Sequence, residues 1–132
     1  MNTNVFLQEK NHRMPVSIAS QWTSLYRENR NNILEPEYQN KDILCICETF
    51  NAKAVQEILN LPDCQGLRIY YGMDTNNATV HAILCGANSK GEDIYLPSID
   101  VNESSHKEEV GYVLEDSNRC PPLCPTDSPL NS

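Results

Sequence analysis

The chain has 132 residues, 39% of them apolar, and a net charge of −8, which suits one globular domain with an acidic surface. We expect no nucleic-acid partner, because a phosphate backbone is bound by clustered Lys and Arg side chains and the ten basic residues form no stripe. Apolar runs such as ILCIC at 43–47 fall far short of the roughly 20 residues that cross a bilayer, so we expect no membrane span.

The first residues read as an N-terminal arm. Residues 1–14 are polar and aperiodic, and they lack the basic start and the apolar block of about 7 to 15 residues that a secretory signal carries. We therefore expect the protein in the cytoplasm.

A helix is predicted directly after Pro15. Ile18, Trp22, Leu25 and Tyr26 recur at the spacing of one helix face, and Ser17 can cap the start. The pattern predicts a helix over 17–30 that packs its apolar face on the core and leaves the opposite face in solvent.

A polar connector leads to a short strand and a second helix. DILCICETF is rich in β-branched and thiol side chains, which predicts a strand over 43–47. In NAKAVQEILNLP, Asn51 supplies an N-cap and Pro62 prevents continuation, so we predict a helix over 52–60.

The segment that follows reads as an antiparallel meander. The runs LRIYYGMD, TVHAILCGAN and DIYLP are separated by short links of Asn, Gly and Ser. Such short links require antiparallel neighbours, and the middle run, apolar on both faces, is expected inside the sheet.

The end of the chain carries a weak strand pattern and then a proline-rich tail. VGYVLED predicts a fourth strand over about 110–114, whereas CPPLCPTDSPLNS has four prolines in thirteen residues and suits neither a helix nor a central strand. We expect a single α+β domain over 15–116, flanked by the arm at 1–14 and a cysteine-proline tail at 117–132. Its antiparallel sheet has three to five strands, with the meander C-terminal, and two main helices packed on one face.

Six cysteines are the chain's most reactive residues. In a reducing compartment we expect four of them to be buried free thiols rather than a disulfide framework. These four are Cys45, Cys47, Cys64 and Cys85.

The pair Cys120 and Cys124 leaves three alternatives open. Zinc would need a second pair such as Cys45 and Cys47, whose C-x-C spacing is not typical of zinc sites. A disulfide is geometrically allowed in a turn, although so short a loop gains little from closure, and a stiff tail with free thiols is the third alternative. Thioredoxin-like chemistry is not expected, because it needs C-x-x-C at the start of a helix.

No catalytic constellation is recognisable, and the glycines fit neither phosphate-binding motif. The three histidines lie in the arm, in a strand and in a polar loop. Arg68, Tyr70 and Gly72 share one face of the first meander strand and are candidates, with His81, to line a small-molecule pocket. An ordinary amphipathic strand face is the alternative.

Three stretches carry a family resemblance: QWTSLYREN at 21–29, LPDCQGLRIYYGMD at 61–74 and the closing CPPLC. With them the chain resembles a group of small, uncharacterised proteins of Bacteroidetes-type bacteria over most of its length. The resemblance implies no particular activity. It directs attention to a set of positions: Trp22, Arg27, Arg68, Tyr70, Tyr71, Gly72, Cys120 and Cys124.

We therefore expect a non-enzymatic interaction or assembly component with a protein partner or self-association, and no cofactor. A thiol-based redox or zinc-binding protein using Cys120 and Cys124 is the first alternative. A small-molecule-binding domain is the second.

Overall fold

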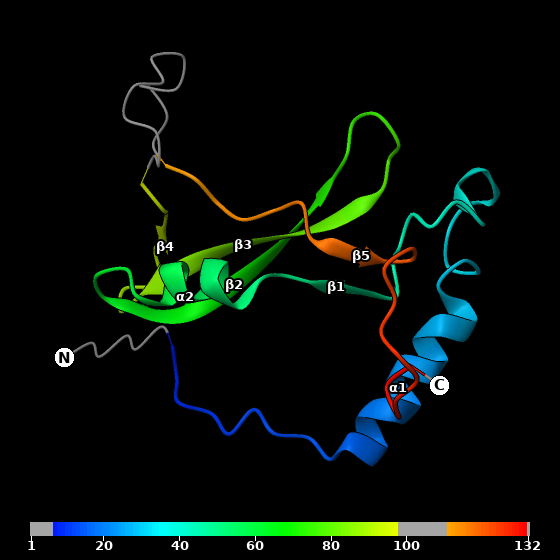
Figure 1. The fold of residues 1–132 in the computed structure, drawn as a ribbon, viewed down its shortest axis with the longest axis horizontal. Helices are drawn as coiled ribbons and strands as arrows, with labels where there is room; N and C mark the ends of the chain where they lie inside the picture. Colours follow the sequence, from blue (N-terminus) through cyan, green and yellow to red (C-terminus); the bar gives the residue numbers. More distant parts are fainter. Residues whose placement is uncertain (1–6, 98–110, 132) are drawn as a thin grey trace. The chain divides into compact units, whose positions relative to one another are not determined.

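The computed structural model describes residues 7–97 and 111–131 of the chain (Figure 1). His106 and the first residue of the predicted fourth strand lie outside the described residues. The elements in chain order are α1 (Val16–Asn29), the 3₁₀ turn η1 (Pro36–Tyr38), β1 (Cys47–Thr49), α2 (Ala52–Leu59), β2 (Cys64–Met73), β3 (Val80–Asn88), β4 (Asp93–Ile94) and β5 (Asn118–Cys120).

These elements confirm the α+β class and arrange the strands in two antiparallel sheets, one of order β2-β3-β4 and one of order β1-β5. The chain also divides into two compact units. Unit 1 is drawn from Met1–Glu9, Phe50–Gly72 and Ala82–Asp116, and unit 2 from Lys10–Thr49, Met73–His81 and Ser117–Ser132.

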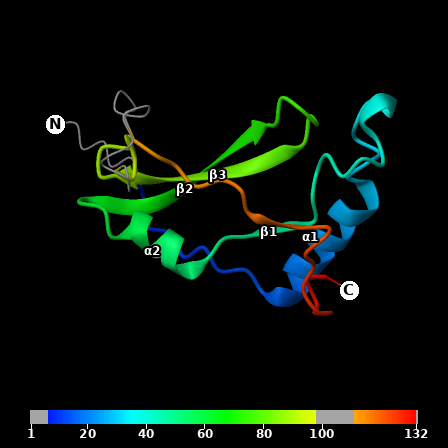
Figure 2. The same ribbon diagram turned by 45° about the horizontal axis from the view of Figure 1, so that its top comes forward.

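Unit 1 is built on the predicted meander, and β3 is its central strand as expected. Five residues of β3 are buried, namely Ala82, Leu84, Cys85, Gly86 and Ala87. The four of them that carry a side chain form most of the core together with Ile58 of α2, which is 1% exposed. In both ribbon views α2 lies beside β2 (Figures 1 and 2). An amphipathic helix covering a half-polar sheet is the expected way to bury one apolar stripe.

The far end of the meander is only partly regular. Gly86 pairs with Ile94 in β4, whereas the predicted fourth strand is reduced to two isolated bridges. In these bridges Leu114 pairs with Leu84, and Tyr112 pairs with Leu96.

Unit 2 contains α1 and the small β1-β5 sheet. The strand predicted over 43–47 is misplaced: only Cys47 belongs to β1, which ends at Thr49. Its partner is β5, so the proline-rich tail begins inside a sheet, with Cys47 facing Cys120 and Thr49 facing Asn118. β5 ends where Pro121 removes the next ladder donor.

Both predicted helices exist within one residue of their expected ends, but their caps differ from the expectation. α1 begins at Val16, one residue before Ser17, and Pro15 holds the N-cap position without a side-chain hydrogen bond. Asn51 does hold the N-cap position of α2, again without a side-chain hydrogen bond.

The packing of α1 contradicts the sequence expectation. None of its residues is buried, although its apolar stripe was expected to join the core. Unit 2 has just two buried apolar residues among those described, Ile43 and Cys120. No helix in the described part of the chain is both long and apolar enough to span a membrane.

Candidate functional site

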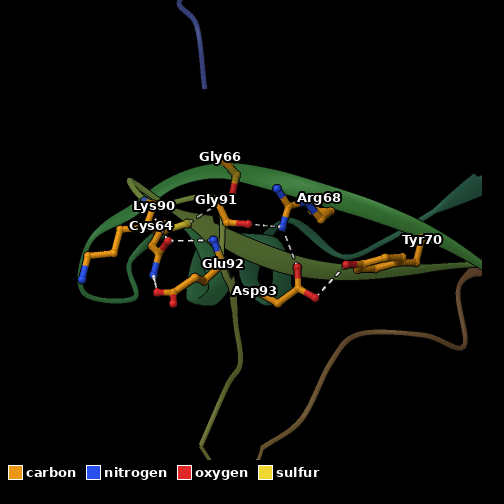
Figure 3. Close-up of polar contacts among 9 residues, drawn as sticks. Cys64, Gly66, Arg68, Tyr70, Lys90, Gly91, Glu92 and Asp93 are labelled. Carbon is orange, nitrogen blue, oxygen red and sulfur yellow. Dashed lines mark hydrogen bonds and ion pairs between the residues drawn. The ribbon is translucent and has the colours of Figure 1, made fainter. Parts of the chain in front are cut away.

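A polar cluster on the three-stranded sheet holds two of the predicted site residues (Figure 3). Arg68 Nη1 donates to Asp93 Oδ1 at 2.6 Å, and Tyr70 Oη donates to Asp93 Oδ2 at 2.7 Å. Arg68 Nη1 also donates to the carbonyl oxygen of Gly91 at 3.0 Å. Because β2 and β4 flank β3, these contacts reach across the central strand and join the two edges of the sheet.

The turn before β4 presents Asp93 to this cluster. Asn88 Oδ1 accepts hydrogen bonds from the backbone N–H groups of Lys90 and Glu92, and Gly91 has a φ of 83°. A side chain at that φ would be strained, so glycine suits the position where the chain reverses.

The ionisable side chains of the cluster shift one another's pKa values. Hydrogen bonds from Tyr70 and Arg68 lower the pKa of Asp93, and the same bond to Asp93 raises the pKa of Tyr70. The buried Cys85 thiol also shares a hydrogen bond with Asp93, and burial is the main reason that the pKa of Cys85 is raised. Arg68, Tyr70 and Cys85 thus all have partners within the sheet, which favours an architectural role for the cluster.

Gly72 and His81, the other two candidates for a small-molecule pocket, also have packing roles. A Cβ on Gly72 would lie 2.7 Å from Ile83 Cδ1, so glycine lets β2 approach the side chain of β3 closely. His81 Nδ1 lies 3.3 Å from Arg119 Nη1 and its Nε2 lies 2.8 Å from Thr79 Oγ1. Since arginine only donates, His81 Nδ1 is the acceptor in its contact with Arg119.

Trp22 lies on an open apolar groove along α1, which is the second candidate site. The groove has a volume of about 520 Å³ and is lined by Trp22, Leu25, Tyr26, Asn29, Arg30 and Ile33. Three large apolar side chains of the groove are well exposed: Trp22 at 64%, Leu25 at 61% and Ile33 at 69%. The apolar helix face that was predicted to pack on the core therefore forms an outer surface.

Polar contacts hold α1 within unit 2. Tyr26 Oη donates to the carbonyl oxygen of Cys45 at 2.6 Å, and Arg27 Nη1 donates to that of Leu130 at 2.6 Å. Arg30 binds Asp42 through Nη2 at 3.1 Å. The helix is attached by the polar tips of its side chains while its apolar surface stays uncovered.

The third candidate site is the tail pair. Cys120 and Cys124 form a disulfide with their Cα atoms 4.6 Å apart. The other four cysteines are free thiols as predicted, but only Cys85 among them is fully buried. Both sulfurs of the pair are bonded to each other, and no group of three or more His, Cys, Asp or Glu side chains that could hold a metal ion occurs among the described residues.

Three residues at these sites were not predicted from the sequence to take part in them. Asp93 stands in no recognisable motif, and only the sheet order brings it to Arg68. Arg119 donates to the carbonyl oxygens of Val80 and Asp42 and so fixes β5, but nothing local marked it. Cys47 had a local signal, its thiol, yet its position opposite Cys120 depends on strand register.

The chain matches no family model, and neither the curated proteins nor the solved structures contain one that matches it.

Proposed function

We propose that this protein is a non-enzymatic interaction component and that the apolar groove of α1 binds a partner protein. The observation that carries the proposal is that α1 has 14 residues and not one of them is buried. Isolated helices of about this length are marginal in water, and most gain their stability by packing an apolar face.

The composition of the exposed surface supports a protein partner. Trp22 and Leu25 project large apolar side chains into the groove, and fully burying one such side chain is worth about 1.5–3 kcal/mol. Tryptophan and tyrosine are also the side chains enriched at the energetic centres of interfaces. Unit 2, with Ile43 and Cys120 as its buried apolar residues among those described, has little core of its own to compensate.

The charge of the segment that carries α1 supports an acidic partner. Residues 10–30 hold four basic residues and one acidic residue, a charge of +3 along the sequence, whereas the whole chain carries −8. Arg30 is the one charged residue among the described residues that line the groove, and it is paired with Asp42. The remainder therefore carries −11, which disfavours an anionic bilayer. The partner that we propose is an acidic amphipathic helix of another protein, which binds with its apolar stripe in the groove. A cytoplasmic location, which we also propose, is supported by the four free thiols.

Trp22 is the chain's one tryptophan, so its fluorescence reports on the groove directly. The probe is a synthetic helix with leucine at i, i+3 and i+4 positions and glutamate elsewhere, compared with a lysine-for-glutamate version. We expect saturable binding of the acidic peptide with a blue shift of the Trp22 emission, and weaker binding of the basic one.

Leu25→Asp tests the groove while leaving the reporter in place. We expect it to abolish the blue shift, because it puts a carboxylate between the apolar anchors and repels the acidic peptide. Leu123→Asp is the matched control, since Leu123 is also 61% exposed but does not line the groove. Equal binding of the two peptides, equal loss in both variants, or a shift that depends only on protein concentration would each refute the proposed partner.

A further inference from the structure

A free thiol lies opposite one end of the disulfide. In the β1-β5 ladder the register pairs Cys47 with Cys120, and Cys47 is not bonded to another cysteine. Facing residues of antiparallel strands project on the same face of the sheet with Cβ atoms about 4.5–5.5 Å apart. Their Cα atoms are about 4.5–5.5 Å apart, which is within the range of about 4.4–6.8 Å that a disulfide spans.

The two sulfurs of the existing disulfide differ in their access to solvent. Cys120 is 0% exposed, so a thiol in solution does not reach it, whereas Cys124 lies in the exposed turn after β5. Cys47 is half-buried and shares the sheet with Cys120. An attack on Cys120 therefore comes from within the protein, and an attack from outside falls on Cys124.

The four free thiols and the short loop favour an exchanging Cys120–Cys124 bond over a purely structural disulfide. Four free thiols coexist with one disulfide that closes a loop of sequence separation 4. So short a loop contributes little through chain entropy, and disulfides in reducing compartments are usually exchanging or redox-sensing ones.

We propose that Cys47, Cys120 and Cys124 form a thiol–disulfide exchange site in which Cys47 is the internal attacking thiol. The Cys47 thiolate attacks Cys120 Sγ, a Cys47–Cys120 bond forms across the strands, and the Cys120–Cys124 bond breaks with Cys124 leaving as a thiolate. One thiolate enters and one leaves, so no oxidant or reductant is consumed.

The product carries its thiolate at the exposed position, where another molecule can meet it. Cys124 can then attack one sulfur of a low-molecular-weight disulfide, forming a mixed disulfide and releasing the other half as a thiolate. The site thus transfers reactivity from the half-buried Cys47 to Cys124 at the surface. This activity goes beyond the proposed interaction function and does not depend on α1.

The exchange can be observed by peptide mapping, because trypsin separates the partners. Cleavage after Lys41, Lys53 and Arg119 places Cys47 in peptide 42–53 and both Cys120 and Cys124 in peptide 120–132. The full-length oxidised protein is held at mildly alkaline pH without oxygen or reductant, quenched in acid, labelled with N-ethylmaleimide and digested. We expect a disulfide-linked pair of these peptides and an equal amount of labelled Cys124.

Cys45→Ser is the matched control for Cys47→Ser. Both cysteines lie in peptide 42–53, but Cys45 is not opposite Cys120, and burial raises the pKa of its thiol. We expect Cys45→Ser to keep the linked peptides and Cys47→Ser to lose both the linkage and the labelled Cys124. Linked peptides in Cys47→Ser at the wild-type level would overturn the assignment of Cys47, and their absence from the wild type would overturn the exchange itself.

A second variant tests the geometry separately. In Cys124→Ser, oxidised glutathione is expected to produce a Cys47–Cys120 disulfide, seen as the same linked peptides carrying one serine. Failure to form this bond, in a variant whose circular dichroism matches the wild type, would show that the two sulfurs do not meet and would refute the proposal.

Discussion

The substitution Asp93→Asn tests whether the polar cluster stabilises the three-stranded sheet. It keeps the size of the side chain but removes the charge that accepts from Arg68 and Tyr70, and its amide group would face one of these donors. The side chains of Arg68 and Asp93 are 21% and 23% exposed, so their ion pair lies between a surface pair and a buried one. From about 0.2–1 kcal/mol for surface pairs and 1.5–3 for buried bonds to charged groups, we expect a loss of about 1–2 kcal/mol.

The assay is thermal unfolding followed by far-ultraviolet circular dichroism. For a chain of this size the expected loss corresponds to a fall in Tm of about 3–8 °C. Glu92→Gln is the control, because it removes the neighbouring carboxylate, which bonds only to Asn88 among the contacts of the described turn. We expect the control to change stability by less than about 0.5 kcal/mol.

The stability lost in Asp93→Asn should depend on pH. The pKa of Asp93 is lowered in the folded protein by Tyr70 and Arg68, so the unfolded chain binds the proton more tightly. The stabilisation is therefore complete above the unfolded pKa of about 3.9 and is lost as the pH falls through the lowered folded pKa. The difference between wild type and Asp93→Asn should be constant from pH 7 to 5 and shrink below pH 4. A variant as stable as the wild type at pH 7, or a difference that does not change with acid, would refute the reasoning.

Two further changes test the packing of unit 1. Ile58→Ala should lower the free energy of unfolding by about 2–5 kcal/mol, measured in urea, because Ile58 is 1% exposed. Leu59→Ala is the control and should lower it far less, because Leu59 is 47% exposed. Similar losses in the two variants would contradict the burial of Ile58. Gly72→Ala should lower the free energy of unfolding by about 1–3 kcal/mol, because its new Cβ would lie 2.7 Å from Ile83 Cδ1. Adding Ile83→Val removes that methyl group and should restore part of the lost stability. A double variant no more stable than Gly72→Ala would contradict this packing role.

Local patterns were sufficient for the elements whose information lies in neighbouring residues. α1 and α2 were predicted within one residue of their ends, since helix periodicity and the flanking prolines act over a few residues. The meander was equally readable, because short links of Asn and Gly force adjacent strands to run antiparallel.

Features that depend on distant partners were missed or misread. β1 was placed too early because its position is decided by β5, about seventy residues away in the chain, through the pairing of Cys47 with Cys120. Arg68 was a candidate site residue, but its partner Asp93 lies on β4, 25 residues further along the chain, and no local pattern links the two. The face of Trp22 was read as core because a periodic apolar stripe indicates that a surface will be covered and does not indicate by what.

The sequence by itself determined where this chain forms helices and a meander, because backbone preference and side-chain periodicity are local properties. The tertiary structure alone decided which side chains meet: the register that sets Cys47 against the disulfide, the sheet order that brings Asp93 to Arg68, and the exposure of the α1 groove. The first two features join residues far apart in the chain, so no single segment of the sequence contains both partners. The described residues that line the groove all fall within 22–33, but its exposure depends on whether the rest of the chain covers it.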